Sequence, residues 1–588
     1  MRFEDLVKYL YRVESTSGRI EMVNLLTELY RNIGEPELAA QVSYILLGEI
    51  QPPYLGGELG ISEKLIARAI ARASGYDTSK VEKRLTELGD VGKVAEEFMS
   101  RRRQKVFLKS ELTVKRVYET LLKISKIQGE RSIDTKIRLL TGLLVDSSPL
   151  EARYIARLAE GNMRLGVADM TILEALANLM GGRELKARLE RAYNRLPDIG
   201  EITKILFKEG WKGIDNVDVV PGIPVRPMLA ERVKSPEEAW EKTGGRLAAE
   251  YKYDGERMQI HIVRDRGIEI FSRRLERITH QFPDVIQIVR EHVKLDEGII
   301  EAEAVAYDPD TKEFKPFQEL MRRKRKHDIH TTAREIPVSL RVFDIIHNGE
   351  SLMNKTFLER RKILEEVVPR IETGEITPSD IEYPKSIDEL WRVFLRAVEE
   401  GLEGLMIKNT GPESIYQAGA RGWLWIKLKR DYRSELTDTL DLVVVGAFYG
   451  RGRKAGLLSS YLMAVYNHEE DVFKTICKVG TGFKDEDIAE MNKMLRPHIL
   501  DKKPARVESK IEPDVWIEPK IVLEITAAEI TLSPLHTCAY DTIEAGVGLA
   551  LRFPRFTGRY RFDKNPEDAT TEDEVIEMYR KQKKVKVS

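Results

Sequence analysis

The sequence predicts a multidomain protein in which an all-α N-terminal domain precedes an α+β domain with antiparallel sheets and a small C-terminal β-barrel. The chain has 588 residues, more than a single hydrophobic core organises, so several domains are expected. Apolar residues recur at three- and four-residue spacing up to about residue 215, alternate with polar residues from residue 246, and form short strand-like runs after residue 430. Hydrophobic residues at 42% and charged residues at 32% are typical of a globular protein rather than of a disordered chain.

The first region, residues 1–215, is predicted to be helical. Segments 6–14 (LVKYLYRVE) and 20–33 (IEMVNLLTELYRNI) show the helical spacing, and Gly181-Gly182 separates two further predicted helices. No fixed-period repeat occurs, which disfavours a solenoid. Pro221, Pro224 and Pro227 then forbid a continuous helix, so an extended connector and a domain boundary near residue 215 are expected.

The second region, residues 216–429, alternates strands with helices. RLAAEYKY (246–253) and RMQIHIV (257–263) flank Asp254-Gly255, and GIEIFSR (267–273) follows another short turn. Tight turns between alternating segments predict an antiparallel meander. The helical segment 387–401 interrupts the later strands, which makes the region α+β.

The third region, residues 430–588, consists of short predicted strands followed by a basic tail. The strand-like segments are DLVVVGAFYG, SSYLMAVYN, FKTICKVG, PKIVLEITAAEITL and LALRFPRF. Five or so short strands predict a small β-barrel. A barrel of the OB type is a common nucleic-acid platform of this size, but the number of strands does not separate it from other small barrels.

Positive charge is clustered although the formal net charge is only −1. Basic runs begin at Arg101, Met321, Gly450 and Lys581. Each run alone is typical of a solvated surface, whereas several in one chain favour contacts with a phosphate backbone.

Cysteine usage and hydropathy exclude several classes of protein. Cys477 and Cys538 are too few for a disulfide framework and lack the spacing of a zinc site, so reduced thiols are expected. No run of about 18 apolar residues occurs, and the N-terminal segment is a charged amphipathic helix without an apolar core. The sequence therefore predicts a cytoplasmic protein that is neither secreted nor membrane-spanning.

Charged residues on predicted strands indicate a functional site in the second region. A hairpin around Asp254-Gly255 would hold Lys252 and Arg257 over one pocket, although this short pattern is equally typical of a surface hairpin. Glu301 and Glu303 lie two residues apart on a strand whose apolar neighbours predict burial. Buried carboxylates require partners.

Three further strands carry residues with two interpretations each. Phe343 lies within an apolar strand, where an ordinary core aromatic is the alternative. The segment GLEGLMIKN places Glu403 and Lys408 on another strand. Trp425, Lys427 and Lys429 share one face of a third strand, an arrangement that a solvated edge strand would also show.

The ordered set of these segments resembles the covalent nucleotidyltransferases, the superfamily that includes ATP-dependent DNA ligases and messenger-RNA capping enzymes. The segments are EYKYDGER from Glu250, FSRR from Phe271, EAE from Glu301, FDI from Phe343, EGLMIK from Glu403, WIKLKRDY from Trp425 and RFDKNPEDATT from Arg561. The helical region with GNMRLGVADMTILEALA (161–177), together with LRFPRF, is similar to archaeal and eukaryotic replicative DNA ligases rather than to capping enzymes.

The resemblance implies three domains. Residues 1–215 would be a helical DNA-binding domain, residues 216–429 an adenylation (nucleotidyltransferase) domain, and residues 430–588 an OB-fold β-barrel domain with a basic C-terminal tail. The barrel would swing between a face that serves ATP and a face that serves DNA, through the connection at 429–437.

The resemblance also implies a role for each matching residue. Lys252 would be the nucleophile that attacks ATP and carries AMP, and cations such as Arg257, Lys427 and Lys429 are expected to lower its pKa by like-charge repulsion. The remaining nucleotide-binding residues would be Glu250 at the adenine edge, Phe343 stacking on adenine, Arg273 and Glu303 at the ribose, Arg421 at the nucleotide, and Arg561, Asp563 and Lys564 at the leaving pyrophosphate.

Two departures from the family pattern are present. Ala302 stands where glycine is frequent, and the segment FTGRYRFDK is one residue longer than in some relatives. The longer segment leaves two assignments open for the first cation of this element, Arg559 and Arg561.

Glu303 and Glu403 would bind the metal ion. Mg²⁺ is the expected ion because it favours few protein carboxylates together with substrate phosphate oxygens, and Mn²⁺ is expected to substitute for it. ATP is the expected cofactor, and the sequence leaves open whether ADP or GTP replaces it.

The function implied is sealing of single-strand nicks in duplex DNA during replication, repair and recombination, through enzyme–lysine–AMP and DNA–adenylate intermediates. The alternative is an RNA-joining or capping-type nucleotidyltransferase, which accounts poorly for the long helical region. A catalytically silent DNA-binding scaffold is a third hypothesis.

A candidate partner site lies in the first region. A short segment there resembles a shortened sliding-clamp-binding peptide, through Gln104, Val106, Phe107 and Leu108. The alternative is a loop that simply packs on the helical domain. A monomer is expected.

Overall fold

Helices occupy the chain from its N-terminus to residue 215 in the computed structural model. The structure describes residues 1–588 except 57–58, 104–109, 130–131, 309–313, 316–319, 321–322, 324–335, 372–373, 401, 430–438, 451–455, 528 and 586–588. The helices are α1 (Phe3–Ser15), α2 (Arg19–Arg31), α3 (Pro36–Leu47), α4 (Glu63–Ser74), α5 (Thr78–Leu88), α6 (Val91–Ser100), α7 (Val114–Ser125), α8 (Ser132–Asp146), α9 (Pro149–Glu160), α10 (Asp169–Leu179), α11 (Lys186–Arg195) and α12 (Ile199–Asp215).

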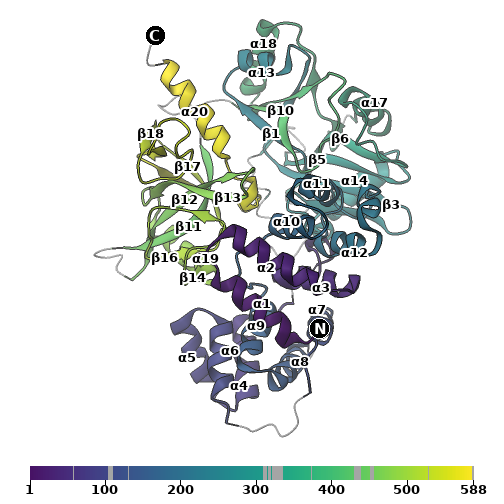
Figure 1. Cartoon of the computed structure of the whole chain (residues 1–588). Coiled ribbons are helices and arrows are strands. Elements are labelled where there is room, and N and C mark those ends of the chain that lie inside the picture. Colours follow the sequence, from purple (N-terminus) through teal and green to yellow (C-terminus); the bar gives the residue numbers. More distant parts are fainter. Residues whose placement is uncertain are drawn as a thin grey trace.

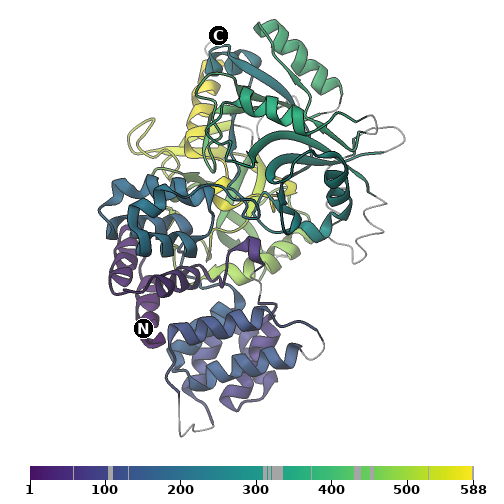
Figure 2. The same cartoon turned by 90° about the vertical axis from the view of Figure 1, so that its right-hand side faces the viewer.

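The apolar stripes of these helices meet in one large core, as the helical spacing predicts. Helices α4 to α9 form the lobe farthest from the rest of the molecule (Figure 2). Gly181 and Gly182 separate α10 from α11, and the proline-containing segment after α12 contains no helix or strand up to residue 228. The prediction of an all-α N-terminal region is therefore confirmed.

Two five-stranded sheets form the middle region (Figure 1). The first has the order β1-β10-β9-β2-β8 and comprises β1 (Leu229–Val233), β2 (Leu247–Lys252), β8 (Ile381–Glu382), β9 (Gly404–Asn409) and β10 (Arg421–Lys429). The second has the order β4-β3-β5-β6-β7 and comprises β3 (Glu256–Val263), β4 (Gly267–Ser272), β5 (Gly298–Ala306), β6 (Val338–Asn348) and β7 (Ile376–Pro378).

Each sheet packs against its own helices. α13 (Pro236–Thr243) and α18 (Ile387–Glu399) share a core with the first sheet, and α14 (Pro283–His292) and α17 (Phe357–Val367) share a core with the second. Most strand pairs are antiparallel, as predicted, but β1 pairs with β10 and β6 with β7 in parallel. The α+β prediction is confirmed.

The predicted hairpin between RLAAEYKY and RMQIHIV is wrong. These segments form β2 and β3, which belong to different sheets, so Asp254-Gly255 is a crossover from one sheet to the other. A Cβ atom on Gly255 would lie 2.3 Å from the carbonyl oxygen of Ala304, and glycine therefore permits the close approach of the crossover to β5. The second predicted hairpin, β3–β4, is present with a regular antiparallel register.

A curled β-sheet forms the C-terminal region. Its strands are β11 (Leu440–Tyr449), β12 (Leu458–Asn467), β13 (Val472–Val479), β14 (Ile499–Leu500), β15 (Val507–Glu508), β16 (Val515–Ile517), β17 (Val522–Thr526) and β20 (Arg555–Tyr560). β18 (Glu529–Ser533) and β19 (Gly548–Arg552) form a separate hairpin, and α19 (Asp485–Leu495) and α20 (Glu572–Val585) pack beside the sheet. The OB-type prediction is confirmed as a half-barrel.

The half-barrel contacts both other regions in this structure. Arg19 of α2 pairs with the buried Asp471 at 3.3 Å, and Arg164 donates to the carbonyl of Ile499 at 2.7 Å. On the other side, Arg421 of β10 pairs with Glu574 of α20 at 2.7 Å. The half-barrel is thus held against both the helical region and the two-sheet region.

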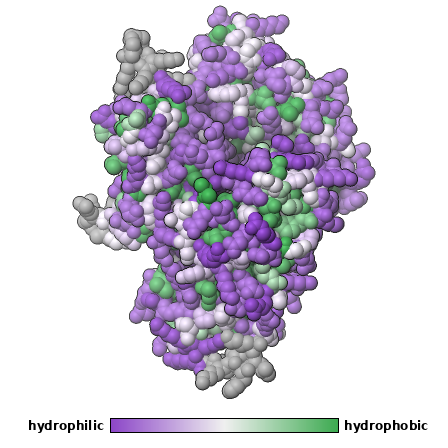
Figure 3. All heavy atoms as spheres, in the orientation of Figure 1, coloured by the Kyte–Doolittle hydropathy of each residue, from purple (hydrophilic) through white to green (hydrophobic). Residues whose placement is uncertain are grey.

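The molecular surface is mostly hydrophilic on the face shown in Figure 3, with small hydrophobic patches. Cys477 and Cys538 are both buried as free thiols, as predicted from the sequence. Among the described residues, we find no helix that is both long and apolar enough to cross a membrane.

Candidate functional site

A pocket of about 280 Å³ lies between the two sheets of the middle region, and the C-terminal half-barrel covers one side of it. Strands β2, β9 and β10 supply one wall, and β3, β5 and β6 supply the other. Every site residue predicted from the sequence lines this pocket: Glu250, Lys252, Arg257, Arg273, Glu303, Phe343, Glu403, Arg421, Lys427, Lys429, Arg561, Asp563 and Lys564.

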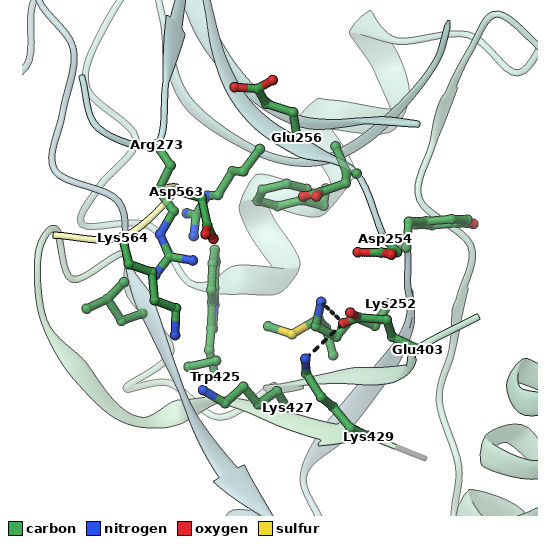
Figure 4. Close-up of a pocket in the computed structure, with 18 of the residues that line it drawn as sticks. Lys252, Asp254, Glu256, Arg273, Glu403, Trp425, Lys427, Lys429, Asp563 and Lys564 are labelled. Carbon is green, nitrogen blue, oxygen red and sulfur yellow. Dashed lines mark ion pairs between the residues drawn. The ribbon is translucent and has the colours of Figure 1, made fainter. Parts of the chain in front are cut away.

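Lys252 and Glu403 form an ion pair at the centre of the pocket. The Lys252 ammonium lies 2.6 Å from Oε2 of Glu403, and the Lys429 ammonium lies 3.2 Å from the same oxygen (Figure 4). Strand pairing brings Lys252 and Glu403 together, because Lys252 is opposite Gly404 and the amide of Glu403 donates to the carbonyl of Lys252 at 3.1 Å. Glu403 therefore lies just before β9 rather than on it.

The charge balance around Lys252 differs from the expectation. Burial works to lower the pKa of Lys252, but the carboxylates of Glu403 and Glu303 outweigh burial and hold that pKa above its ordinary value of 10.5. Arg257 and Lys429, two of the cations expected to lower it, are themselves paired with carboxylates, Glu301 and Glu403. The prediction that neighbouring cations depress the pKa of Lys252 is wrong for this state of the site.

The carboxylates near Lys252 differ in their pKa shifts. Burial raises the pKa of Glu303 to about 7, and burial also raises the pKa of Asp254. In contrast, the nearby ammonium groups of Lys252 and Lys429 outweigh burial and lower the pKa of Glu403. At neutral pH, Glu403 is therefore ionised and Glu303 is close to its midpoint.

Aromatic rings line the opposite end of the pocket. Phe343 and Trp425 meet edge to face with their ring centroids 6.1 Å apart. The Lys408 ammonium lies 5.2 Å from the Phe343 ring centroid and donates to the Phe343 carbonyl at 2.7 Å. Phe343 thus presents a partly buried ring to the pocket, and the hydrogen bond from Lys408 to its carbonyl fixes its backbone. Such a ring can serve as a stacking surface.

Arg257 is fixed by Glu301, the other carboxylate of the EAE segment. Its Nη2 donates to both oxygens of Glu301 at 2.9 Å, and its Nη1 donates to the carbonyl of Met228 at 2.8 Å. Tyr416 also donates to Glu301 at 2.9 Å. The two carboxylates of β5 therefore divide their roles, with Glu301 buried as a structural partner and Glu303 facing the pocket.

Basic residues line the part of the pocket near the half-barrel. Burial lowers the pKa of Lys427 well below its ordinary value. Nε of Arg273 is buried and has no hydrogen-bond partner in the described part of the chain, and Arg421 is engaged by Glu574. Figure 4 shows Arg273, Lys427 and Lys564 on the same side of the pocket.

The half-barrel contributes a tightly paired cluster. Arg561 donates to both oxygens of Asp441 at 2.9 and 2.8 Å, and to Asp563 at 2.9 and 2.8 Å. Lys564 also donates to Asp441. Arg559 has longer pairs, at 3.7 Å with Asp254 and 3.9 Å with Glu524. Both arginines left open by the sequence thus line the pocket, with different degrees of pairing.

Comparison with known proteins identifies the family. The family models "DNA ligase N terminus", "ATP dependent DNA ligase domain" and "ATP dependent DNA ligase C terminal region" match residues 2–177, 227–429 and 454–564. DNA ligase 2 of Thermofilum pendens is 50% identical, over 98% of this chain and 97% of its own. A DNA ligase of Staphylothermus marinus is 49% identical over 99% of each chain, and one of Aeropyrum pernix is 49% identical over 99% and 98%.

The chain belongs to the ATP-dependent DNA ligase family. ATP and a divalent metal ion are the cofactors of this family, and nicked DNA is its substrate. Because the likeness to DNA ligases covers nearly the whole chain, the alternative of an RNA-joining or capping enzyme is not favoured.

The pocket of this ligase fits a hard divalent cation bound partly through its substrate. Glu303 and Glu403 offer oxygen ligands beside Lys252, and within the described ranges no group of three or more His, Cys, Asp or Glu residues forms a complete protein cage. Mg²⁺ is commonly held by one or two carboxylates together with phosphate oxygens. Two pocket carboxylates are consistent with that mode.

Several residues around this ligase site were not assigned a role from the sequence. Asp441 forms ion pairs with Arg561 and Lys564. The sequence feature that could have indicated this role is its position as a charged residue at the start of the apolar run DLVVV. Arg361 contacts Glu250 from α17, and nothing in the local sequence of that helix indicates the contact. The clamp-like segment Gln104–Leu108 and most of the connection after Lys429 lie outside the described residues.

Proposed function

We propose that this ligase seals nicks in duplex DNA with Lys252 as the nucleophile that carries AMP. The observation that carries the proposal is the position of the Lys252 ammonium, 2.6 Å from Glu403, in a pocket that also contains Phe343 and the cations of the half-barrel. A nucleophilic amine beside carboxylates, an aromatic stacking surface and phosphate-binding cations are the parts that nucleotidyl transfer needs.

In the first step, the free amine of Lys252 attacks the α-phosphorus of ATP. A nitrogen–phosphorus bond forms, the bond from the α-phosphorus to the bridging oxygen breaks, and pyrophosphate leaves with the electron pair. Glu403 and Glu303 raise the pKa of Lys252. Before the amine can attack, the ammonium therefore has to release a proton to solvent and its ion pair with Glu403 has to break. Hence the resting site stores the nucleophile in its protonated form.

The other site residues predicted from the sequence have proposed roles in nucleotide binding. Phe343 stacks on adenine, Glu250 contacts its edge, and the ribose lies near Arg273 and Glu303. Arg257, Arg421, Lys427 and Lys429 neutralise phosphate charge, and Arg561, Asp563 and Lys564 orient the pyrophosphate. Their common location in one pocket supports these assignments.

Glu303 and Glu403 are the proposed metal ligands, with Mg²⁺ as the ion and Mn²⁺ as its substitute. Bound there with substrate phosphate oxygens, the ion would supply positive charge next to the carboxylates that hold the Lys252 ammonium. The residues themselves bind the ion and, in its absence, hold the proton of Lys252.

In the later steps, the 5′-phosphate of the nick attacks the lysine-bound AMP and frees Lys252. The adjacent 3′-hydroxyl then attacks the 5′-phosphorus, a phosphodiester forms and AMP leaves. We propose that residues 1–215 bind DNA, 216–429 carry the adenylation chemistry and 430–588 form the mobile half-barrel, a division supported by the three family matches.

Four further proposals rest on the sequence. The segment Gln104–Leu108 binds a sliding clamp, the protein acts as a monomer, it is located in the cytoplasm, and its nucleotide is ATP, with ADP or GTP as substitutes to be tested.

Strand joining tests the proposed function. A duplex with one nick is incubated with the protein, ATP and Mg²⁺, and the products are separated to detect the joined strand and a DNA–adenylate. The matched control is the same duplex without the 5′-phosphate, which has no acceptor for AMP. We expect joining only with the 5′-phosphate; joining of nicked RNA but not of nicked DNA would contradict the proposal.

A further inference from the structure

Glu250 lies at the aromatic end of the pocket and has cations on both of its oxygens. It is almost fully buried, two residues before Lys252 on β2. The Lys408 ammonium lies 2.9 Å from Oε2, and Nη1 of Arg361 lies 3.3 Å from Oε1. An isolated buried carboxylate is costly, so these two cations are what permits Glu250 to be charged there.

The two cations differ in their access to the pocket. Lys408 lines the pocket and its ammonium lies 4.7 Å from the Trp425 ring centroid. Arg361 does not line the pocket and reaches Glu250 from behind, out of α17. Any effect of Arg361 on a bound nucleotide therefore has to pass through the pocket-lining residues that it contacts, Glu250 and Ser379.

The guanidinium of Arg361 is itself fixed by three contacts other than Glu250. Its Nε donates to Glu365 at 2.8 Å, its Nη2 donates to the carbonyl of Ser379 at 2.8 Å, and its Nη1 donates to the Ser379 hydroxyl at 3.1 Å. Helix α17 is anchored in turn by a capping box at Thr356 and by the buried ion pair of Arg360 with Asp344, the neighbour of Phe343. The planar fork of Arg361 is thus held in one orientation.

A charged carboxylate accepts hydrogen bonds but cannot donate them. It can therefore distinguish adenine from hypoxanthine and guanine. The exocyclic amine of adenine donates to such an acceptor, whereas the oxygen at the same position of hypoxanthine or guanine is repelled by it. Burial raises the pKa of Glu250, while Lys408 and Arg361 work in the opposite direction and favour the charged form. Removal of one cation weakens both the orientation and the charge of Glu250.

We propose that Arg361 is a positioning residue for base selection, which holds Glu250 as a charged acceptor aimed at the exocyclic amine of ATP. This inference rests on the proposed function, because it places the adenine of ATP beside Phe343 and Glu250. Arg361 sets the preference for ATP without contacting it, and Lys408 is the direct cation of the same pair.

The test compares ATP with inosine triphosphate, which carries an oxygen in place of the amine. Single-turnover labelling of Lys252 is measured over a range of each nucleotide in the full chain with Mg²⁺, for wild type, Arg361→Gln and Arg361→Lys. Lys362→Gln, an exposed position on the same helix, is the matched control. Thermal unfolding of every variant is recorded alongside.

We expect Arg361→Gln to reduce the ratio of second-order rate constants for ATP and inosine triphosphate by at least about 10-fold, the scale of one hydrogen bond to a charged group. The loss should appear in the KM for ATP and not in the rate at saturation. Arg361→Lys should recover part of the ratio, and Lys362→Gln should keep it whole. A purely structural role would instead lower the rates with both nucleotides equally.

An unchanged ratio in a folded Arg361→Gln protein would overturn the inference while leaving Lys252 labelling intact. Absence of labelling in wild type with either nucleotide would refute the proposed function and this inference together. If Arg361→Gln does not fold, Glu365→Ala replaces it, because that change removes one anchor of the guanidinium at an exposed position outside the pocket and keeps the buried charge pair. The ratio should then fall by a few-fold, and an unchanged ratio would again overturn the inference.

Discussion

Replacing Glu403 with glutamine should make Lys252 a more reactive amine in the metal-free protein. The carboxylate lies 2.6 Å from the Lys252 ammonium, and the side chains are only 22% and 19% exposed, so solvent screens the pair weakly. A hydrogen bond to a charged group contributes about 1.5–3 kcal/mol, and about 1.4 kcal/mol corresponds to a factor of ten in proton affinity. Loss of Glu403 also leaves Lys429 as an uncompensated neighbouring cation.

Reductive methylation with formaldehyde measures this effect, because the reagent is small and reacts with the free amine. Wild type and Glu403→Gln are treated at pH 8 with a metal chelator and without nucleotide, and methylation of Lys252 is followed by peptide mass spectrometry. The pKa of Lys252 lies above 10.5 in wild type, so its free amine is scarce at pH 8. We expect methylation of Lys252 to be about 10-fold faster in the variant.

Two controls make this result specific to the ion pair. Glu413→Gln removes an exposed carboxylate and should leave the Lys252 rate unchanged, and the exposed Lys115 serves as an internal reference in each digest. Equal or slower methylation of Lys252 in Glu403→Gln would refute the conclusion that the carboxylates of the resting site keep this lysine protonated.

Three other outcomes are expected. Burial raises the pKa of Glu303 to about 7 from 4.5, so the folded protein binds this proton more tightly than the unfolded chain; its contribution to stability is full below pH 4.5 and is lost as pH rises through 7. The Tm of metal-free wild type should therefore fall more between pH 5 and 8 than that of Glu303→Gln, and parallel curves would contradict this. Phe343→Ala should raise the KM for ATP in Lys252 labelling by about 10-fold or more, since stacking of a base on an aromatic ring contributes about 1–3 kcal/mol; an unchanged KM would exclude Phe343 as the stacking ring. Arg360→Met leaves Asp344 as a buried unpaired charge and should lower the free energy of unfolding by about 3–5 kcal/mol in denaturant titration, while a loss below about 1 kcal/mol would show that Asp344 finds another partner.

Local patterns in the sequence were sufficient for the elements and for most pocket residues. Three- and four-residue spacing predicted the helices up to residue 215, and alternation predicted strands such as β3 and β4. The ordered charged segments named the residues that meet in the pocket, from Lys252 on β2 to Lys564 after β20. Local spacing fixes which side of an element a residue faces, and the family resemblance supplied which elements share a site.

Strand partners and charge partners could not be predicted in the same way. An Asp-Gly pair between two alternating segments is typical of a hairpin, but the hydrogen bonds of β2 are made with β9 and those of β3 with β4 and β5. The choice made by β2 depends on β9, which lies more than a hundred positions away and which no local pattern encodes. Gly255 is needed for its close approach to β5 rather than for a tight hairpin turn.

The same limit explains the error about Lys252. The sequence shows many cations close to it in the predicted site, but not that Glu301 occupies Arg257 or that Glu403 is shared by Lys252 and Lys429. The electrostatic balance of a buried site depends on which opposite charges arrive from distant strands. Arg361 was missed for the same reason, since its contact with Glu250 spans 111 positions.

Covalent labelling of Lys252 tests the central claim most directly. Wild type, Lys252→Ala and the exposed-site control Lys115→Ala are incubated with ATP labelled at the α-phosphate and Mg²⁺, and a duplex with one nick is then added. We predict stable label on wild type and on the control, none on Lys252→Ala, and loss of the label as nicks close. Equal labelling of all three proteins, or none in any folded protein, would contradict the assignment of Lys252 as the nucleophile.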